Sequence, residues 1–279
     1  MRKLGKYAAW CTPLLAFGAA GQEAMYTEAA TMPSPGVVVI RPLINYSEFE
    51  EEPGGERQET ERVDLTTTVQ YGIARAWSVR MEVPLMLEER EYSNGTDESD
   101  TGVEDLGVTF KWRVYKNDSA GVNTSRIALL GGASFASGDD KDFSTQTVNP
   151  HLGAVYTLVR GRHGFNQELT YRLNTGQDDV DNTGGGRGPD DALLYNTAYL
   201  YRIAPAKYSA DSTGAWYVTG ELNGLYETNG DNEIRLSPGV MFEGWNFAFE
   251  VMGQVPIISD LEDRADMRFG VGLGFRWTF

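Results

Sequence analysis

The last eleven residues, FGVGLGFRWTF (269–279), alternate strictly between large apolar residues and glycine, arginine or threonine. Such alternation predicts a β-strand with one apolar and one polar face, because successive side chains of a strand point to opposite sides. The same pattern recurs along the chain and predicts twelve strands, at 36–47, 61–73, 77–88, 105–115, 126–136, 147–158, 164–174, 192–203, 215–227, 232–242, 245–257 and 267–279. No stretch of the sequence sustains a helical period, so we expect an all-β fold.

The connections between these segments differ in length. Those after the second, sixth and tenth predicted strands are tight (ARA, VRGRH and EG), whereas those after the first, third, fifth, seventh and eleventh are longer and acidic. An outer-membrane barrel has this asymmetry, with short periplasmic turns and long external loops. Lipid offers no partners for backbone polar groups, so a spanning sheet must close on itself. The sequence therefore predicts a closed up-and-down antiparallel transmembrane β-barrel of about 12 strands over residues 36–279.

The start of the chain resembles an export signal. A basic start (Arg2, Lys3 and Lys6) precedes an apolar stretch and small residues up to Ala20, which predicts a signal peptide over residues 1–20. Its removal would take away Cys11, the sole cysteine, leaving no disulfide framework and no cysteine-bound metal. Residues 21–35 are predicted to form a periplasmic N-terminal lead-in, and the sequence leaves open whether this lead-in enters the pore.

The two faces of the predicted strands indicate which side touches lipid. In a secreted β-sandwich, the alternative fold, the apolar stripe would lie in a core, but here nearly every strand repeats it for about ten residues. A charge that points at acyl chains near the bilayer midplane costs about 2–4 kcal/mol for Arg or Lys. The charged stripe is therefore predicted to face the lumen and line the pore, and it consists of Arg41, Asp64, Arg80, Glu82, Lys111, Arg113, Glu168, Arg172, Arg202, Glu221, Arg235, Glu250, Arg268 and Arg276.

The terminal strand also resembles a known targeting signal. It ends in an aromatic residue and has apolar residues at alternate positions before it, like the C-terminal signal by which the barrel assembly machinery recognises outer-membrane proteins. The residues that carry this resemblance are Phe269, Val271, Leu273, Phe275, Trp277 and Phe279. The resemblance implies an outer-membrane location and the assembly machinery as a partner.

A narrower resemblance covers most of the chain after the lead-in. VEDLGVTFKWRV (103–114), WSVRMEVPLM (77–86) and SGDDKDFSTQTVNPHLGAVYTL (137–158) are similar to strands and a Gly-Asp loop of outer-membrane proteins associated with the phenol meta-cleavage pathway, which are inferred to be transporters. The family has glycine before its Asp-Leu pair, where this chain has Glu104. The resemblance implies transport across the outer membrane, with an aromatic solute as one expectation.

Three functions fit these observations. The first is a channel for passive uptake of small molecules, aromatic or anionic, because basic residues predominate in the predicted lumen. The second is a structural or adhesive barrel with a closed lumen and acidic extracellular loops. The third is an outer-membrane lipase or protease, but His151 and His163 have no Ser or Asp at a recognisable motif spacing. We expect a channel and no enzyme.

The charge of the chain bears on its partners. With 24 Lys and Arg against 40 Asp and Glu, the formal charge is −16, which argues against a nucleic acid. We expect outer-membrane lipid, lipopolysaccharide and a small-molecule solute as partners, and no cofactor. The acidic loops, such as DDVDN at 178–182, offer oxygen ligands for divalent cations, but no complete calcium-loop spacing appears and no metal site is predicted.

Overall fold

A computed structural model describes residues 23–50, 57–92, 94–119, 122–139, 143–176, 190–209, 211–262 and 264–279. The predicted signal peptide (1–20) and the DDVDN loop lie outside these residues. In the described part of the chain, no helix is long and apolar enough to cross a membrane.

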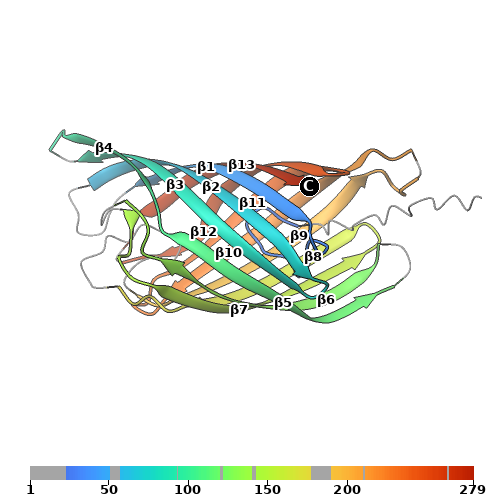
Figure 1. Cartoon of the computed structure of the whole chain (residues 1–279). Helices are drawn as coiled ribbons and strands as arrows, with labels where there is room; N and C mark the ends of the chain where they lie inside the picture. Colours follow the sequence, from blue (N-terminus) through green and yellow to red (C-terminus); the bar gives the residue numbers. More distant parts are fainter. Residues whose placement is uncertain are drawn as a thin grey trace, which may run out of the picture.

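The strands form one antiparallel sheet that closes on itself (Figure 1). The first strand pairs with the second on one side and with the last on the other, which closes the barrel. The strands are β1 (Val38–Glu50), β2 (Arg57–Ala74), β3 (Trp77–Tyr92), β4 (Asp97–Val103), β5 (Leu106–Asp118), β6 (Thr124–Phe135), β7 (Asn149–Arg160), β8 (His163–Arg172), β9 (Ala192–Ala204), β10 (Gly214–Glu227), β11 (Asn232–Gly244), β12 (Phe247–Asp260) and β13 (Asp266–Thr278). The predicted fold class is confirmed.

The extra strand, β4, was not predicted. It pairs with Leu85–Glu91 of β3, whereas β5 pairs with the first part of the same strand, Trp77–Glu82. β4 and β5 therefore pair with successive parts of β3 on the same side and occupy one place in the wall. The barrel wall is twelve strands wide for this reason. β4 reads DESDTGV and lacks apolar alternation, because it extends the wall beyond the apolar band.

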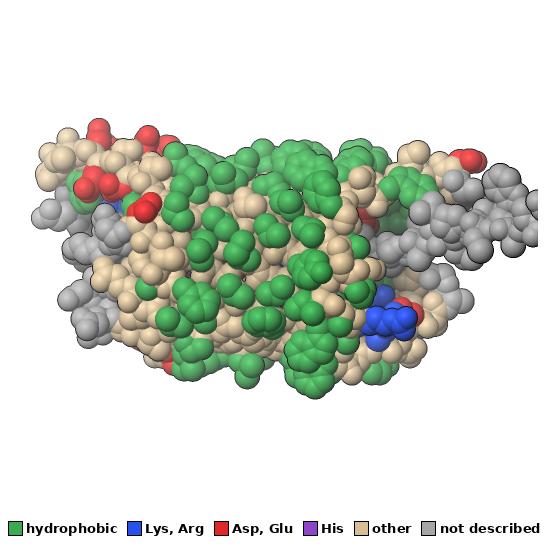
Figure 2. All heavy atoms as spheres, in the orientation of Figure 1, with side chains coloured by type: hydrophobic (Ala, Val, Ile, Leu, Met, Phe, Trp, Pro, Cys, Tyr) green, Lys and Arg blue, Asp and Glu red, His purple; other side chains and the backbone are tan. Residues whose placement is uncertain are grey.

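The apolar stripe faces outward. Figure 2 shows hydrophobic side chains spread over the middle of the outer surface, with charged side chains towards the two ends. The rings of Trp77 and Trp112 stack on neighbouring strands with centroids 5.2 Å apart. Large apolar side chains on this outer face are about 40% exposed, for example Leu273 (37%) and Val271 (43%). An exposed apolar surface of this size is unfavourable in water and is suited to contact with lipid.

The junction between β4 and β5 holds the connection between β6 and β7 against the wall. The Asp105 carboxylate accepts hydrogen bonds from the backbone N–H groups of Ser137 (3.1 Å), Gly138 (3.1 Å) and Thr145 (2.9 Å), and from the Thr145 hydroxyl (2.7 Å). A Cβ on Gly138 would lie 2.5 Å from the Phe143 carbonyl oxygen, so this close approach requires glycine. Two segments that carried the family resemblance, 103–114 and 137–158, thus meet in space through Asp105.

The hydrogen bonds also act on the ionisation of Asp105. Burial alone would raise the pKa of this carboxyl group, but hydrogen bonds from the Ser144 and Thr145 hydroxyls and from the Thr145 and Gly138 backbone outweigh burial, and the pKa lies below its ordinary value of 3.8. The carboxylate form is therefore the one that fastens the connection to the wall.

Replacing an outward-facing residue by a charge tests the orientation of the sheet. Leu273→Arg would place a guanidinium in the middle of the outer stripe of β13, and we expect it to destabilise the barrel by about 2–4 kcal/mol. Thr68→Arg, on the lumen face of β2 beside the cavity, is the matched control and should be tolerated. Urea unfolding in lipid vesicles measures both, and equal stability of the two variants would contradict the assignment of the faces.

Removing the Asp105 charge should release the β6–β7 connection and leave the barrel intact. Hydrogen bonds to a charged acceptor are worth roughly 1.5–3 kcal/mol, so we expect amide exchange of residues 137–138 and 145 in Asp105→Asn to rise at least about tenfold. Asp97→Asn, an exposed position on β4, is the control.

The same release should occur in acid. A group whose pKa is lowered by folding stabilises the fold above its ordinary pKa, and this stabilisation is lost as the pH falls through the lowered value. We therefore expect pepsin to cleave the β6–β7 connection of the unmodified protein only at a pH below the ordinary value of 3.8. Cleavage that begins well above that pH would show that Asp105 is not the fastening group.

Candidate functional site

A segment that precedes the first strand lies inside the barrel. Residues 23–31, here called the inserted segment, lie in the lumen, where Met25, Thr27 and Thr31 are buried. The Thr31 hydroxyl donates to the Glu23 carboxylate, so the two ends of the segment lie together. Its tip reaches β1, where the Tyr26 hydroxyl donates to Asn45 Oδ1 at 2.7 Å. The sequence left open whether the lead-in enters the barrel, and residues 23–31 of it do lie in the lumen.

The barrel wall binds the backbone of the inserted segment from several sides. Arg41 Nη2 donates to the Ala24 carbonyl oxygen at 2.6 Å, and Lys111 Nζ donates to the carbonyl oxygens of Ala29 (2.9 Å) and Thr31 (3.2 Å). On the acceptor side, the amide nitrogens of the segment donate to Glu168, Glu221 and Thr157, as at Ala30 N to Thr157 Oγ1, 2.8 Å. Polar groups enclosed in the lumen are therefore satisfied by wall and segment together.

Ion pairs fix the two acidic side chains of the inserted segment. Glu23 pairs with Arg276 at 2.8 Å, and the same arginine pairs with Glu243 at 2.8 Å. Glu28 pairs with both Arg80 and Lys111. These groups are largely or fully enclosed, and removal of one partner from such a pair is costly, about 3–5 kcal/mol, because it leaves a buried charge uncompensated.

A cavity of about 320 Å³ remains beside the inserted segment. One side is formed by the segment itself, and the rest by the inner faces of the wall strands. Charged groups of both signs, including Arg172 and Glu82, share this lining with the His151 ring and the apolar side chains of Leu43 and Leu194. This part of the lumen is therefore a small polar space with apolar parts.

Nine residues of the predicted lumen set lie around the segment and the cavity. They contact the segment, pair with a residue that does, or line the cavity: Arg41, Arg80, Glu82, Lys111, Glu168, Arg172, Glu221, Glu250 and Arg276. Asp64 lies in register with Asn45 and with the fully buried Met86, on the inner side of β2.

Four predicted residues lie towards the ends of the barrel. Near the end of the barrel that holds the β2–β3 turn, Arg113 donates to the Arg75 carbonyl oxygen, and the Arg202 guanidinium lies 4.1 Å from the centre of the Tyr208 ring. At the opposite end, Arg235 pairs with Glu233 at 2.7 Å. Arg268 is the fourth, and it lies away from the lumen.

Arg268 turns outward because of a bulge. The register between β1 and β13 steps from Phe269 to Met267 and leaves Arg268 without a partner position on β1. Met267 is buried, whereas Arg268 lies among the carboxylates of Glu48, Glu50 and Glu59 at the outer surface, with Glu59 at 3.2 Å. A bulge adds one residue to a strand and so reverses the side of the next side chain, which alternation alone could not show.

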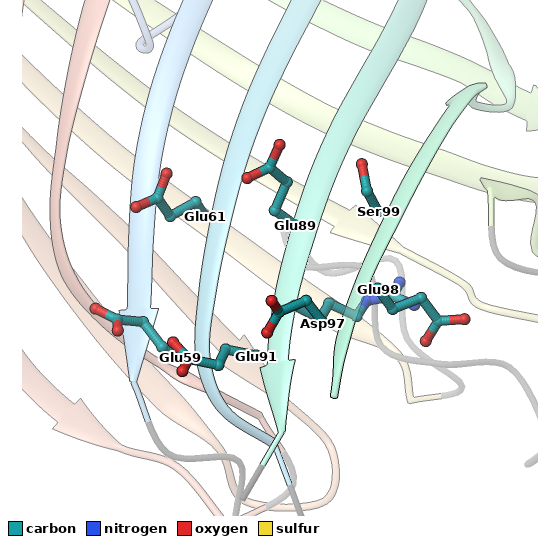
Figure 3. A pocket seen from close by; sticks show the side chains of 8 residues that line it. Glu59, Glu61, Glu89, Glu91, Asp97, Glu98 and Ser99 are labelled. Carbon is teal, nitrogen blue, oxygen red and sulfur yellow. The ribbon is translucent and has the colours of Figure 1, made fainter. Parts of the chain in front are cut away.

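The outer wall near this bulge carries a dense acidic surface. Figure 3 shows Glu61, Glu89 and Ser99 in one row, and the neighbouring row holds Glu59, Glu91 and Asp97. These rows border a hollow of about 460 Å³ outside the barrel. Like charges directly opposite one another on a sheet are destabilising, so the facing carboxylates in these rows repel one another. Among the residues that the structure describes, no group of His, Cys, Asp or Glu is arranged to hold a metal ion.

Sequence reasoning missed the acidic residues of the inserted segment as site residues. The signal was a charge imbalance: the predicted lumen set contains nine basic and five acidic residues, and an enclosed lumen favours neutralisation. Part of the missing negative charge comes from Glu23 and Glu28. Another part comes from wall residues outside the predicted set, Glu233 and Glu243.

The two histidines lie in different places. His151 lines the cavity, and its Nε2 lies 2.9 Å from the Thr109 hydroxyl. His163 follows the turn between β7 and β8, where its Nδ1 lies 2.6 Å from the Tyr199 hydroxyl. Tyr199 is about half exposed on the outer face.

Comparisons with known proteins agree with this architecture. The sequence matches no protein-family model and no curated protein. Among solved structures, the chain is similar to an outer membrane channel from Pseudomonas putida F1, with 12% identity, a TM-score of 0.58, and coverage of 91% of this chain and 98% of that one. It is also similar to the β domain of the Bordetella autotransporter BrkA, with 11% identity, a TM-score of 0.54, and coverage of 88% and 100%. The chain is thus a twelve-stranded β-barrel of the outer-membrane type.

Proposed function

We propose that this barrel is a passive outer-membrane channel for small molecules, whose passage runs beside the inserted segment. The observation that carries the proposal is the cavity of about 320 Å³ inside the lumen, lined by charged groups of both signs. A purely structural barrel has no need of an enclosed space with such a lining. The fold, shared with an outer membrane channel, agrees with transport.

The lining of the cavity favours a small aromatic anion as the solute. Arg172 and His151 offer hydrogen-bond donors, while Leu43, Leu130 and Leu194 offer apolar contact. A flat ring with one carboxylate combines both requirements, and the volume lies near the lower end of the range for small-molecule sites, about 300–1,000 Å³. The expected outer-membrane lipid, lipopolysaccharide and assembly-machinery partners belong to the same proposal.

A closed structural or adhesive barrel is the second candidate. The observation that favours it is the inserted segment, which is hydrogen-bonded to the wall along most of its length. We propose that the protein is no enzyme, since His151 bonds to a threonine inside the lumen and His163 lies at a turn.

Single-channel recording in planar bilayers separates the two candidates. A channel should give a small, steady conductance, because the segment occupies much of the lumen. We expect benzoate, as a probe of the solute class, to reduce this current more than benzamide, its neutral counterpart of the same shape. Reconstituted barrels that pass no current at all would favour the closed barrel, and equal effects of the two probes would remove the preference for an anion.

Reversing one cavity charge should change ion selectivity. Arg172→Glu alters the charge by two units, which at about 8 Å in a water-like medium corresponds to roughly 1 kcal/mol, or about fivefold in the anion-to-cation permeability ratio. The ratio should fall, and most strongly at low salt, where screening is weakest. Reversal potentials in a salt gradient measure it, with Lys207→Glu, an exposed position beyond β9, as the control. An unchanged ratio would place the ion path away from Arg172.

A further inference from the structure

One carboxylate of the wall collects the donors at the tip of the inserted segment. The Glu221 side chain on β10 accepts hydrogen bonds from the backbone N–H groups of Met25 (2.9 Å), Tyr26 (3.1 Å) and Thr27 (2.7 Å), and from the Thr27 hydroxyl (2.6 Å). The Glu221 residue is fully buried. Three successive amides that converge on one anion form a strong charge-assisted contact that depends on the path of the backbone.

A second part of the wall, strand β13, leaves room for the side chains of the same tip. Glycines at alternate positions of β13 face the lumen, and a Cβ on Gly272 would lie 2.2 Å from the Tyr26 hydroxyl oxygen and 2.7 Å from Met25 Sδ. A Cβ on Gly274 would lie 3.2 Å from the terminal methyl of Met25. The tip therefore occupies space that exists because Gly272 and Gly274 have no side chains.

We propose that Glu221 and Gly272 form a docking site for an extended peptide backbone, occupied by residues 25–27, and that this site fixes the position of the inserted segment and so the width of the passage. Glu221 recognises the amides, and Gly272 admits Tyr26. Both are positioning residues. The ion pairs of Glu23 and Glu28 hold the base of the segment, so loss of the docking site frees the tip first. The docking site is independent of the identity of the solute.

Thiol labelling measures the docking directly. Ala24→Cys places a reporter at a buried position next to the tip in the full chain, with Cys11→Ser to remove the other thiol. We expect Gly272→Val to raise the rate of modification by a membrane-impermeant maleimide at least about tenfold, since overpacking of a filled site is destabilising. Gly253→Val is the matched control on the lipid face of β12, where an added Cβ meets only the Gly270 carbonyl oxygen, at 4.0 Å.

A size-compensating pair distinguishes a lost docking site from a disturbed barrel. Gly272→Ala should also speed labelling, and Tyr26→Leu in the same chain should return the rate towards the starting value, because it removes the atom nearest to the new Cβ. Glu221→Gln keeps the shape but puts an amide N–H₂ against the segment donors, and we expect faster labelling there too, by at least about tenfold.

Folding and function are read separately. Heat-modifiable migration in gels selects variants with an intact barrel, and conductance of these variants should rise with the labelling rate. Labelling at the unmodified rate in folded Gly272→Val and Glu221→Gln would overturn the docking site. Absence of current in every variant, together with accelerated labelling, would contradict the proposed channel function and leave the docking site supported.

Discussion

The need to satisfy every backbone polar group inside lipid governs the rest of this structure. A sheet in hydrocarbon has no water at its edges, so the first strand must pair with the last. The register between β1 and β13 runs from Val39 opposite Thr278 to Glu50 opposite Asp266. Closure then imposes two environments on every strand, since side chains alternate between lipid and an enclosed lumen. The outer stripe, the charged interior and the inserted segment all follow from that division.

The terminal strand shows how one segment serves both environments. Its outer residues, such as Leu273 and Trp277, lie in the apolar band and carry the pattern that resembles an assembly signal. Its inner residues are glycines up to Gly274 and then Arg276, which pairs with Glu23 of the inserted segment. The inserted segment thus explains the glycines and the single cation on the inner face of this strand. Contact with lipid explains the apolar residues on its outer face.

The sequence predicted those features that repeat. Alternation placed the twelve strands of the wall, because a period of two holds as long as a strand is regular and half-apolar. Alternation gave no prediction or a wrong one where a strand lacks an apolar face or is interrupted by a bulge. The polar extension β4 has no apolar face to alternate, and the bulge at Arg268 reverses the parity that alternation assumes. The inserted segment has no period at all, so its place depends on contacts with β10 and β13 that are remote in sequence.

Charge balance connects the inserted segment to the chemistry of the lumen. A charge enclosed in the lumen is unfavourable unless ions or protein groups compensate it. Glu28 divides its carboxylate between Arg80 and Lys111, and Glu23 meets Arg276. Arg172 lines the cavity beside the segment, together with Glu82 and Glu168. The segment therefore fills part of the lumen and also neutralises cations of the wall, so the same residues that occupy the interior set its charge.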